Sequence, residues 1–126
     1  MNRHYVAYHR RLDHGPLIDE DPFRVWTRKK VTHLPDAWVW MIEGIVGPPR
    51  QYVLGSVFRV ERIQEATAPS VHQAWGMGRA FLPPVPLDQL PWFSLLLKAT
   101  SRFSLGLALI KDPIVIAGLT TLGNPD

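Results

Sequence analysis

The chain has 126 residues, 46% hydrophobic and 20% charged, which predicts a single domain spanning residues 1–126 with a modest core of its own. A net charge of +3 fits an anionic partner such as a nucleic acid, but it does not require one. The absence of cysteine excludes a disulfide framework, and the start MNRHYVAYHRR lacks the apolar core of a signal peptide, which suits a cytoplasmic protein.

The first half of the chain predicts strands. Residues His4 to Arg10 alternate apolar and polar side chains as a first strand does, and the Gly, Pro and Asp of LDHGPLIDEDPF predict a loop after it. Asp36 to Gly44, DAWVWMIEG, is dense in aromatic and β-branched residues and predicts a buried strand. We expect this strand to form an antiparallel hairpin with the next one, because the connection IVGPPRQ is short.

The strand expected from Tyr52 to Ile63 shows the clearest alternation in the sequence. Its pattern places Tyr52, Leu54, Phe58 and Val60 on one face, and Gly55 is a candidate for a β-bulge. After it, Gln64 to Gly78 has no period, so we expect a long surface loop that carries Trp75.

The last third of the chain predicts helix and strand. Prolines 83, 84 and 86 favour extended backbone, and a short helix should follow with Pro91 in its first turn and Phe93, Leu96 and Leu97 facing the core. RFSLGLALIKDPIVIAGL predicts either further strands or a strand and a short helix, interrupted at Pro113. Cationic residues divide this apolar half into runs too short to cross a membrane. Together the elements predict an α+β fold, a small twisted, partly closed, barrel-like sheet with one or two packed helices.

Catalytic chemistry finds little support in the sequence. The five histidines lack paired metal-ligand spacing, and no Asp or Glu is followed two positions later by Lys, as in many metal-dependent nucleases. GMGRAF places Phe81 where a dinucleotide fingerprint needs its third glycine. We therefore expect no enzymatic activity, no metal and no cofactor. The histidines are His4, His9, His14, His33 and His72.

Five tryptophans favour binding instead. Trp38 and Trp40 share one strand face, where core packing is the ordinary role, and Trp92 at a helix start is also expected to pack. Trp26 and Trp75 differ, because one stands beside the cationic run of FRVWTRKK and the other among Gly, Ala and Ser. For each of these two, packing and ligand contact remain alternatives.

The order of these features resembles the PUA-like superfamily, particularly its EVE and YTH branches, which read modified bases. The matching pieces are HYVAYH, Trp26 followed by Thr27, VWMIEGIVGPPRQYVLGSVFRVERI, Trp75, PPVPLDQL and SRFSLGLALI, so the resemblance spans nearly the whole chain. The chain departs from the family's pattern in an N-terminal half without an obvious helix and in a very apolar final segment.

The resemblance implies a non-catalytic module that grips a methylated base, flipped out of DNA, in an aromatic cage of Trp26 and Trp75. 5-Methylcytosine is the first candidate and 6-methyladenine the second. Such a module would be the sensing part of a modification-dependent restriction system, with a nuclease domain or subunit as its partner. The base and phosphate contacts are then Thr27, Arg28, Lys29, Lys30, Ser101 and Arg102.

Four alternatives stay open. In the first, the cationic residues after Trp26 are only a solvated strand end, and in the second Arg102 caps helix carbonyls rather than binding phosphate. The module could bind RNA instead of DNA, or the chain could be a protein-interaction domain that uses its exposed aromatic side chains.

Overall fold

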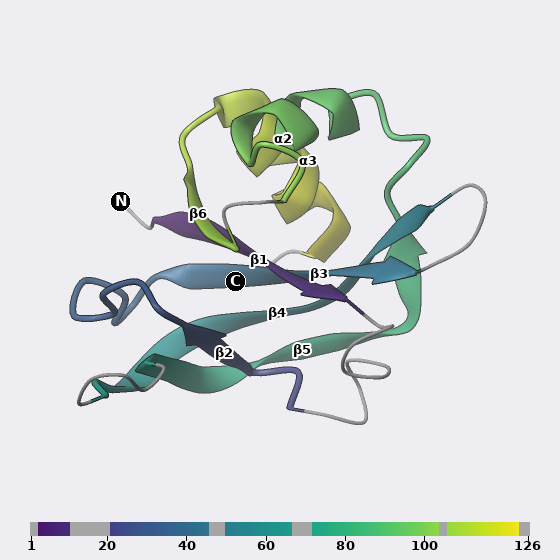
Figure 1. Ribbon diagram of the computed structural model, residues 1–126. Helices are drawn as coiled ribbons and strands as arrows, with labels where there is room; N and C mark the ends of the chain where they lie inside the picture. Colours follow the sequence, from purple (N-terminus) through teal and green to yellow (C-terminus); the bar gives the residue numbers. More distant parts are fainter. Residues whose placement is uncertain (1–2, 11–20, 46–49, 67–71, 104–105, 124–126) are drawn as a thin grey trace.

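A curled six-stranded sheet forms the centre of the computed structural model, which describes residues 3–10, 21–45, 50–66, 72–103 and 106–123. Two helices pack against the sheet, so the fold is α+β and resembles a half-closed barrel, as predicted (Figure 1). The elements are β1 (His4–Arg10), β2 (Arg24–Thr27), β3 (Trp38–Ile45), β4 (Gln51–Gln64), β5 (His72–Pro86), α2 (Phe93–Ala99), β6 (Leu107–Ile110) and α3 (Pro113–Gly123).

The strand order is β2-β5-β4-β3-β1-β6, with β1 and β3 parallel and every other neighbouring pair antiparallel. This order makes β2 and β6 the two edges of the sheet. Curling brings the edges close enough for the Lys29 ammonium, just after β2, to donate a hydrogen bond to the carbonyl of Leu107 in β6 at 2.6 Å. The sheet is therefore partly closed by a side chain rather than by a strand ladder.

Both faces of the sheet bury apolar side chains. The concave face holds one core, in which Phe58, Val60 and Val39 are fully buried. The opposite face is covered by α2 and α3, whose Leu96 and Leu119 pack with Trp40 in a second core. Burying a side chain of this size stabilises the fold by roughly 1.5–3 kcal/mol, so both cores contribute.

The hairpin of β3 and β4 is confirmed, and so is the bulge at Gly55, because the β4–β5 register shifts between Leu54 and Ser56. The predicted grouping of the β4 side chains is wrong. Leu54 packs in the helix-covered core, whereas Phe58 and Val60 lie in the concave core. The extra residue of the bulge shifts the alternation of side chains by one position. Side chains that were expected on one face of β4 therefore lie on opposite faces before and after the bulge.

The surface loop expected over Gln64 to Gly78 is wrong from His72 onward, where β5 begins. A Cβ on Gly76 would lie 1.8 Å from the carbonyl oxygen of Arg59 in β4, and one on Gly78 would lie 2.0 Å from that of Val57. These glycines therefore let β5 approach β4 closely where the sheet curls, and the same glycines hide the strand pattern in the sequence. The extended backbone expected at the prolines is confirmed, because β5 continues to Pro86.

The short helix after the prolines is confirmed as α2, which starts at Phe93 with Trp92 as its N-cap. The predicted place of Pro91 in the first turn is wrong, because Pro91 lies in the turn before the N-cap. Phe93 and Leu96 are buried, and Leu97 is half-buried against the same core. Of the two arrangements expected for the last segment, the strand and helix are present, as β6 and α3, with Pro113 at the helix start. Most of the predicted loop LDHGPLIDEDPF lies outside the described residues.

Candidate functional site

Trp26 lies on the edge strand β2, whose four residues RVWT point alternately into and out of the curled sheet. Val25 and Thr27 are buried on the concave side, whereas Trp26 is 60% exposed. A β-branched, aromatic sequence favours a strand here, and pairing with β5 on one side leaves the other side of β2 open. The ring of Trp26 is therefore accessible to a ligand.

Trp75 of β5 lies on the same outward face as Trp26, because its partner in the ladder is Arg24, two residues before Trp26. The Arg24 guanidinium carbon lies 4.6 Å from the centre of the Trp75 ring and 5.8 Å from that of Trp26. Arg24 also donates hydrogen bonds to Asp21 at 3.1 Å and to Gln73 at 2.5 Å. The two predicted cage residues are thus brought together, and a base placed between them would have to displace Arg24.

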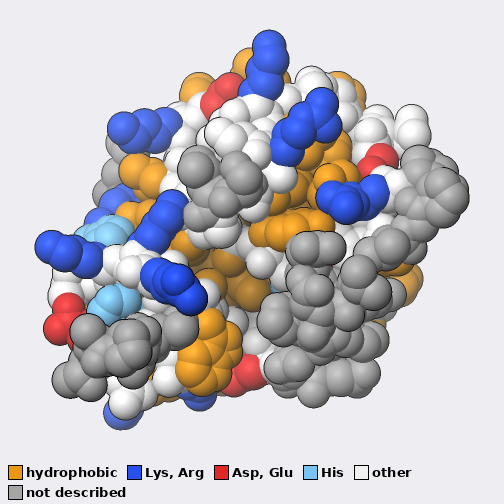
Figure 2. Space-filling model, viewed as in Figure 1, with side chains coloured by type: hydrophobic (Ala, Val, Ile, Leu, Met, Phe, Trp, Pro, Cys, Tyr) orange, Lys and Arg blue, Asp and Glu red, His pale blue; other side chains and the backbone are white. Residues whose placement is uncertain are grey.

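A cavity of about 290 Å³ opens beside Trp26, in the gap between the two sheet edges. The view into the curled sheet in Figure 2 shows hydrophobic side chains in a hollow at the centre of this face, with Lys and Arg side chains around it. This volume is at the small end of ligand pockets, the size class of a single ring system. The lining residues are Ala7, Tyr8, Val25, Trp26, Thr27, Arg28, Lys29, Gly106 and Leu107.

The cationic run after Trp26 divides into residues with different surroundings. The buried Thr27 hydroxyl accepts a hydrogen bond from the Lys29 backbone N–H at 3.0 Å, which fixes the turn at the end of β2. Lys29 itself is engaged with the Leu107 carbonyl. Arg28 and Lys30 are exposed, so these two cations are the ones available to a phosphate.

Ser101 and Arg102 follow α2 in left-handed backbone conformation, with φ of 50° and 57°. The Arg102 backbone N–H, rather than its guanidinium, bonds the Leu97 carbonyl at 2.7 Å, which ends the helix. The next residue, Phe103, stacks on Tyr8 with ring centres 5.0 Å apart, and Tyr8 lines the cavity beside Trp26. The Ser101–Arg102 turn is therefore connected to the cavity through these two rings.

The other tryptophans pack as predicted. Trp40 is fully buried and donates a hydrogen bond to Nδ1 of His4 at 3.0 Å. Trp38 is half-buried against the same helix-covered core. Trp92 lies against α3, where a Cβ on Gly118 would meet its ring at 2.3 Å.

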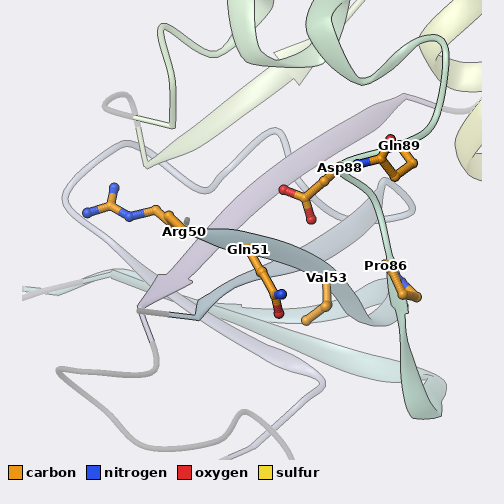
Figure 3. Close-up of a pocket in the computed structure, with 6 residues that line it drawn as sticks. All are labelled: Arg50, Gln51, Val53, Pro86, Asp88 and Gln89. Atoms are coloured by element: carbon orange, nitrogen blue, oxygen red, sulfur yellow. The ribbon is translucent and has the colours of Figure 1, made fainter. Parts of the chain in front are cut away.

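A second cavity, of about 440 Å³, was not foreseen from the sequence. It lies where β4 begins and β5 ends, and Figure 3 shows Arg50 pointing away from its other lining side chains. Asp88 accepts a hydrogen bond from the Tyr52 backbone N–H at 3.0 Å. A side-chain hydrogen bond with Tyr52 raises the pKa of Arg50, and the negative charges of Tyr52 and Tyr8 in their phenolate forms raise it further. The lining residues are Arg50, Gln51, Val53, Pro86, Asp88 and Gln89.

Sequence reasoning missed Arg24 and Tyr8 as members of the site. Arg24 was within reach of that reasoning, because residues two apart on a strand share a face and FRVWTRKK contains both Arg24 and Trp26. Across the described ranges, no cluster of three or more His, Asp or Glu side chains is arranged to hold a metal ion. Nor does any helix there combine the length and apolarity needed to span a membrane.

Comparisons with protein-family models, with curated proteins and with solved structures found no match. The similarity to the PUA-like superfamily therefore stays a prediction that depends on the sequence motifs.

Proposed function

We propose that this domain binds nucleic acid at the β2 edge and takes one base against Trp26. The observation that carries the proposal is the accessible Trp26 ring, 60% exposed at the rim of a cavity with cationic residues along the same edge. The base would be methylated and flipped out of DNA, with methylated cytosine first and methylated adenine second, as the family resemblance implies. The domain would then serve as the sensor of a modification-dependent restriction system whose nuclease lies in another domain or subunit.

The energetics of flipping are compatible with this site. Extruding a base costs a few kcal/mol of lost stacking and pairing. Stacking on an aromatic side chain returns roughly 1–3 kcal/mol per base, so one tryptophan offsets part of the cost and two offset most of it. A methyl group placed in the apolar part of the cavity adds about 0.8 kcal/mol, which favours the modified base.

The cations supply affinity that does not depend on sequence. Arg28 and Lys30 are exposed beside the cavity and can reach phosphates of a bound strand. Lys29 has a different role, because its ammonium holds the two sheet edges together. Ser101 and Arg102 are proposed as a further phosphate contact, joined to the cavity through the stacked Phe103 and Tyr8.

The test is a titration of the protein with methylated and unmethylated DNA duplexes of one sequence, and with the matched RNA, at several salt concentrations. Tighter binding of the methylated duplex, with a steep loss of affinity as salt rises, is the expected result. Equal binding of both duplexes would refute modified-base recognition. Binding of the RNA alone would assign the domain to RNA.

An Arg24→Ala variant decides how the base is held. If the base enters between Trp26 and Trp75, removing Arg24 empties the space it must occupy and should tighten binding. If the base stacks on Trp26 while Arg24 stays against both rings, the variant loses a cation next to the ligand and binding should weaken. Arg24 lies on an exposed edge, and circular dichroism of the variant controls for folding.

A protein-interaction domain is the second candidate function. It is favoured by the exposure of large apolar side chains outside the cavity, notably Met77 at 69% and Leu82 at 72%. Salt separates the two functions, because an aromatic protein interface should respond weakly to added salt where phosphate binding responds steeply.

A further inference from the structure

The outward face of β2, of β4 from Arg59 to Arg62 and of β5 from Trp75 to Met77 is not covered by either helix. Further along the same face, Leu54, Val57 and Phe81 pack in the helix-covered core. Figure 1 shows α2 and α3 on one side of the molecule and β2 and β5 at the opposite side. Side chains directly opposite each other in a ladder share a face, so the register gives the composition of this surface. One row across the strands is Arg24, Trp75 and Arg62, and the next is Met77 and Arg59.

Large apolar side chains are exposed on this surface rather than buried. Met77 is 69% exposed, and Trp26 at its edge is 60% exposed. Trp75 is half-buried beneath the Arg24 guanidinium. An aromatic ring on an open sheet face offers a stacking position for a planar ring, and the thioether of Met77 offers a sulfur–aromatic contact.

The charges on the same surface are mainly positive. Arg59 pairs with Asp36 at 3.0 Å and Arg24 with Asp21 at 3.1 Å, and both pairs are exposed enough to exchange for phosphate at little cost. Among the described residues, no carboxylate lies within 4.0 Å of the side-chain nitrogens of Arg62. A free arginine beside exposed aromatic and apolar groups is complementary to a polyanion that carries stacked rings.

We infer that this face binds a single strand of nucleic acid, with bases on Trp26 and Met77 and phosphates on Arg62 and Arg59. Strands lie about 4.8 Å apart, so the surface from β2 to β4 extends roughly 10 Å. At a spacing of about 3.4 Å per nucleotide along one strand, this accommodates about three nucleotides. The face differs from the cavity between the sheet edges, and it needs no modified base.

The inference is independent of modified-base recognition, although Trp26 belongs to both surfaces. A domain that bound single strands without preferring methylated duplexes would satisfy this inference and refute the proposed function. A preference for methylated duplexes without single-strand binding would support the proposed function and refute this inference.

The experiment titrates the whole chain with unmodified oligo-dT and oligo-U, and measures the slope of log Kd against log salt. Arg62→Ala is compared with Lys111→Ala, which removes the same charge from an exposed residue beyond β6, at the other edge of the sheet order. One lost phosphate contact should lower the slope by about 0.7 and weaken binding about fivefold at 0.1 M salt. Lys111→Ala should leave both quantities unchanged.

A third variant, Met77→Ala, removes an exposed side chain and should weaken binding without changing the salt slope, because it removes a stacking contact and no charge. Equal losses in Arg62→Ala and Lys111→Ala would show diffuse electrostatic attraction and overturn the inference. Failure of the unchanged protein to bind either oligonucleotide at low salt would also overturn it, and would leave the face to a protein partner. The comparison of oligo-dT with oligo-U tells whether the strand is DNA or RNA.

Discussion

Replacing Trp26 with alanine should separate ligand contact from packing, because 60% of this residue remains exposed in the folded chain. A tryptophan buries up to about 250 Å² when fully covered, so folding covers roughly 100 Å² of Trp26. At about 25 cal/mol per Å², the variant loses at most ~2.5 kcal/mol of folding free energy, and this is an upper bound because the unfolded chain already covers part of that area. The fold should therefore survive.

The binding effect of the same variant should be larger on modified DNA than on unmodified DNA. Stacking on one aromatic wall contributes roughly 1–3 kcal/mol per base, which corresponds to a loss of about 5-fold to 150-fold in affinity. An unmodified duplex stays paired, so none of its bases stacks on the Trp26 ring, and its affinity should change little in the variant. The assay is fluorescence anisotropy with matched methylated and unmethylated duplexes, on samples whose thermal melting has been recorded.

Trp40→Ala is the matched control, because Trp40 is fully buried and bonded to His4. Truncating a core tryptophan costs roughly 3–5 kcal/mol, so this variant should melt far lower while its folded fraction binds normally. If Trp26→Ala instead melts as low as Trp40→Ala and shows no selective loss of methylated DNA, Trp26 is a packing residue. The proposed base site should then be abandoned.

Three further variants test the surroundings of the site. Arg28→Ala combined with Lys30→Ala should weaken methylated and unmethylated duplexes alike, since phosphate contacts do not read the base; a selective loss of the methylated duplex in anisotropy would contradict this. Lys29→Met should lower the unfolding free energy by about 1–2 kcal/mol in urea melts by removing the donor to Leu107, whereas an unchanged midpoint would mean that the contact between the edges contributes nothing. Gly76→Ala should cost roughly 1–3 kcal/mol, because its Cβ meets a backbone carbonyl, and a variant as stable as the parent in the same melts would refute the close approach of β5 to β4.

Local pattern was sufficient for most of the fold. The strand predicted at His4 to Arg10 has the bounds of β1, because alternation there is uninterrupted by a bulge. The strand β5 was missed, because Gly76 and Gly78 are required by the curl of the sheet and weaken the pattern that identifies a strand. Gly55 marked its bulge correctly, yet the sequence alone did not show that the bulge exchanges the faces beyond it.

The candidate site depends on contacts that local pattern does not contain. Trp26 was selected because it stands beside cations within one short stretch, and in the structure 60% of the residue is exposed. Its neighbour Trp75 was placed in a loop, and the contact of Arg24 with that ring needs the β2–β5 ladder, which pairs Arg24 with Trp75 across a long stretch of chain. The bond from Lys29 to Leu107 spans 78 residues and depends on how far the sheet curls. No sequence pattern within one segment specifies how closely the two edges of the sheet approach each other.

The position of Trp26 decides how these experiments must be combined. The residue lines the cavity between the edges and also borders the open outer face, so Trp26→Ala removes a wall from both surfaces. The cations do not share this ambiguity, because Arg28 lines the cavity and Arg62 lies on the outer face opposite Trp75. The deciding substrate is a methylated duplex with a single-stranded flank. If one strand crosses both surfaces, Arg28→Ala and Arg62→Ala should each weaken binding of that substrate. Two independent surfaces would give each variant a defect on a different substrate, and the double variant would lose the sum of the two free energies.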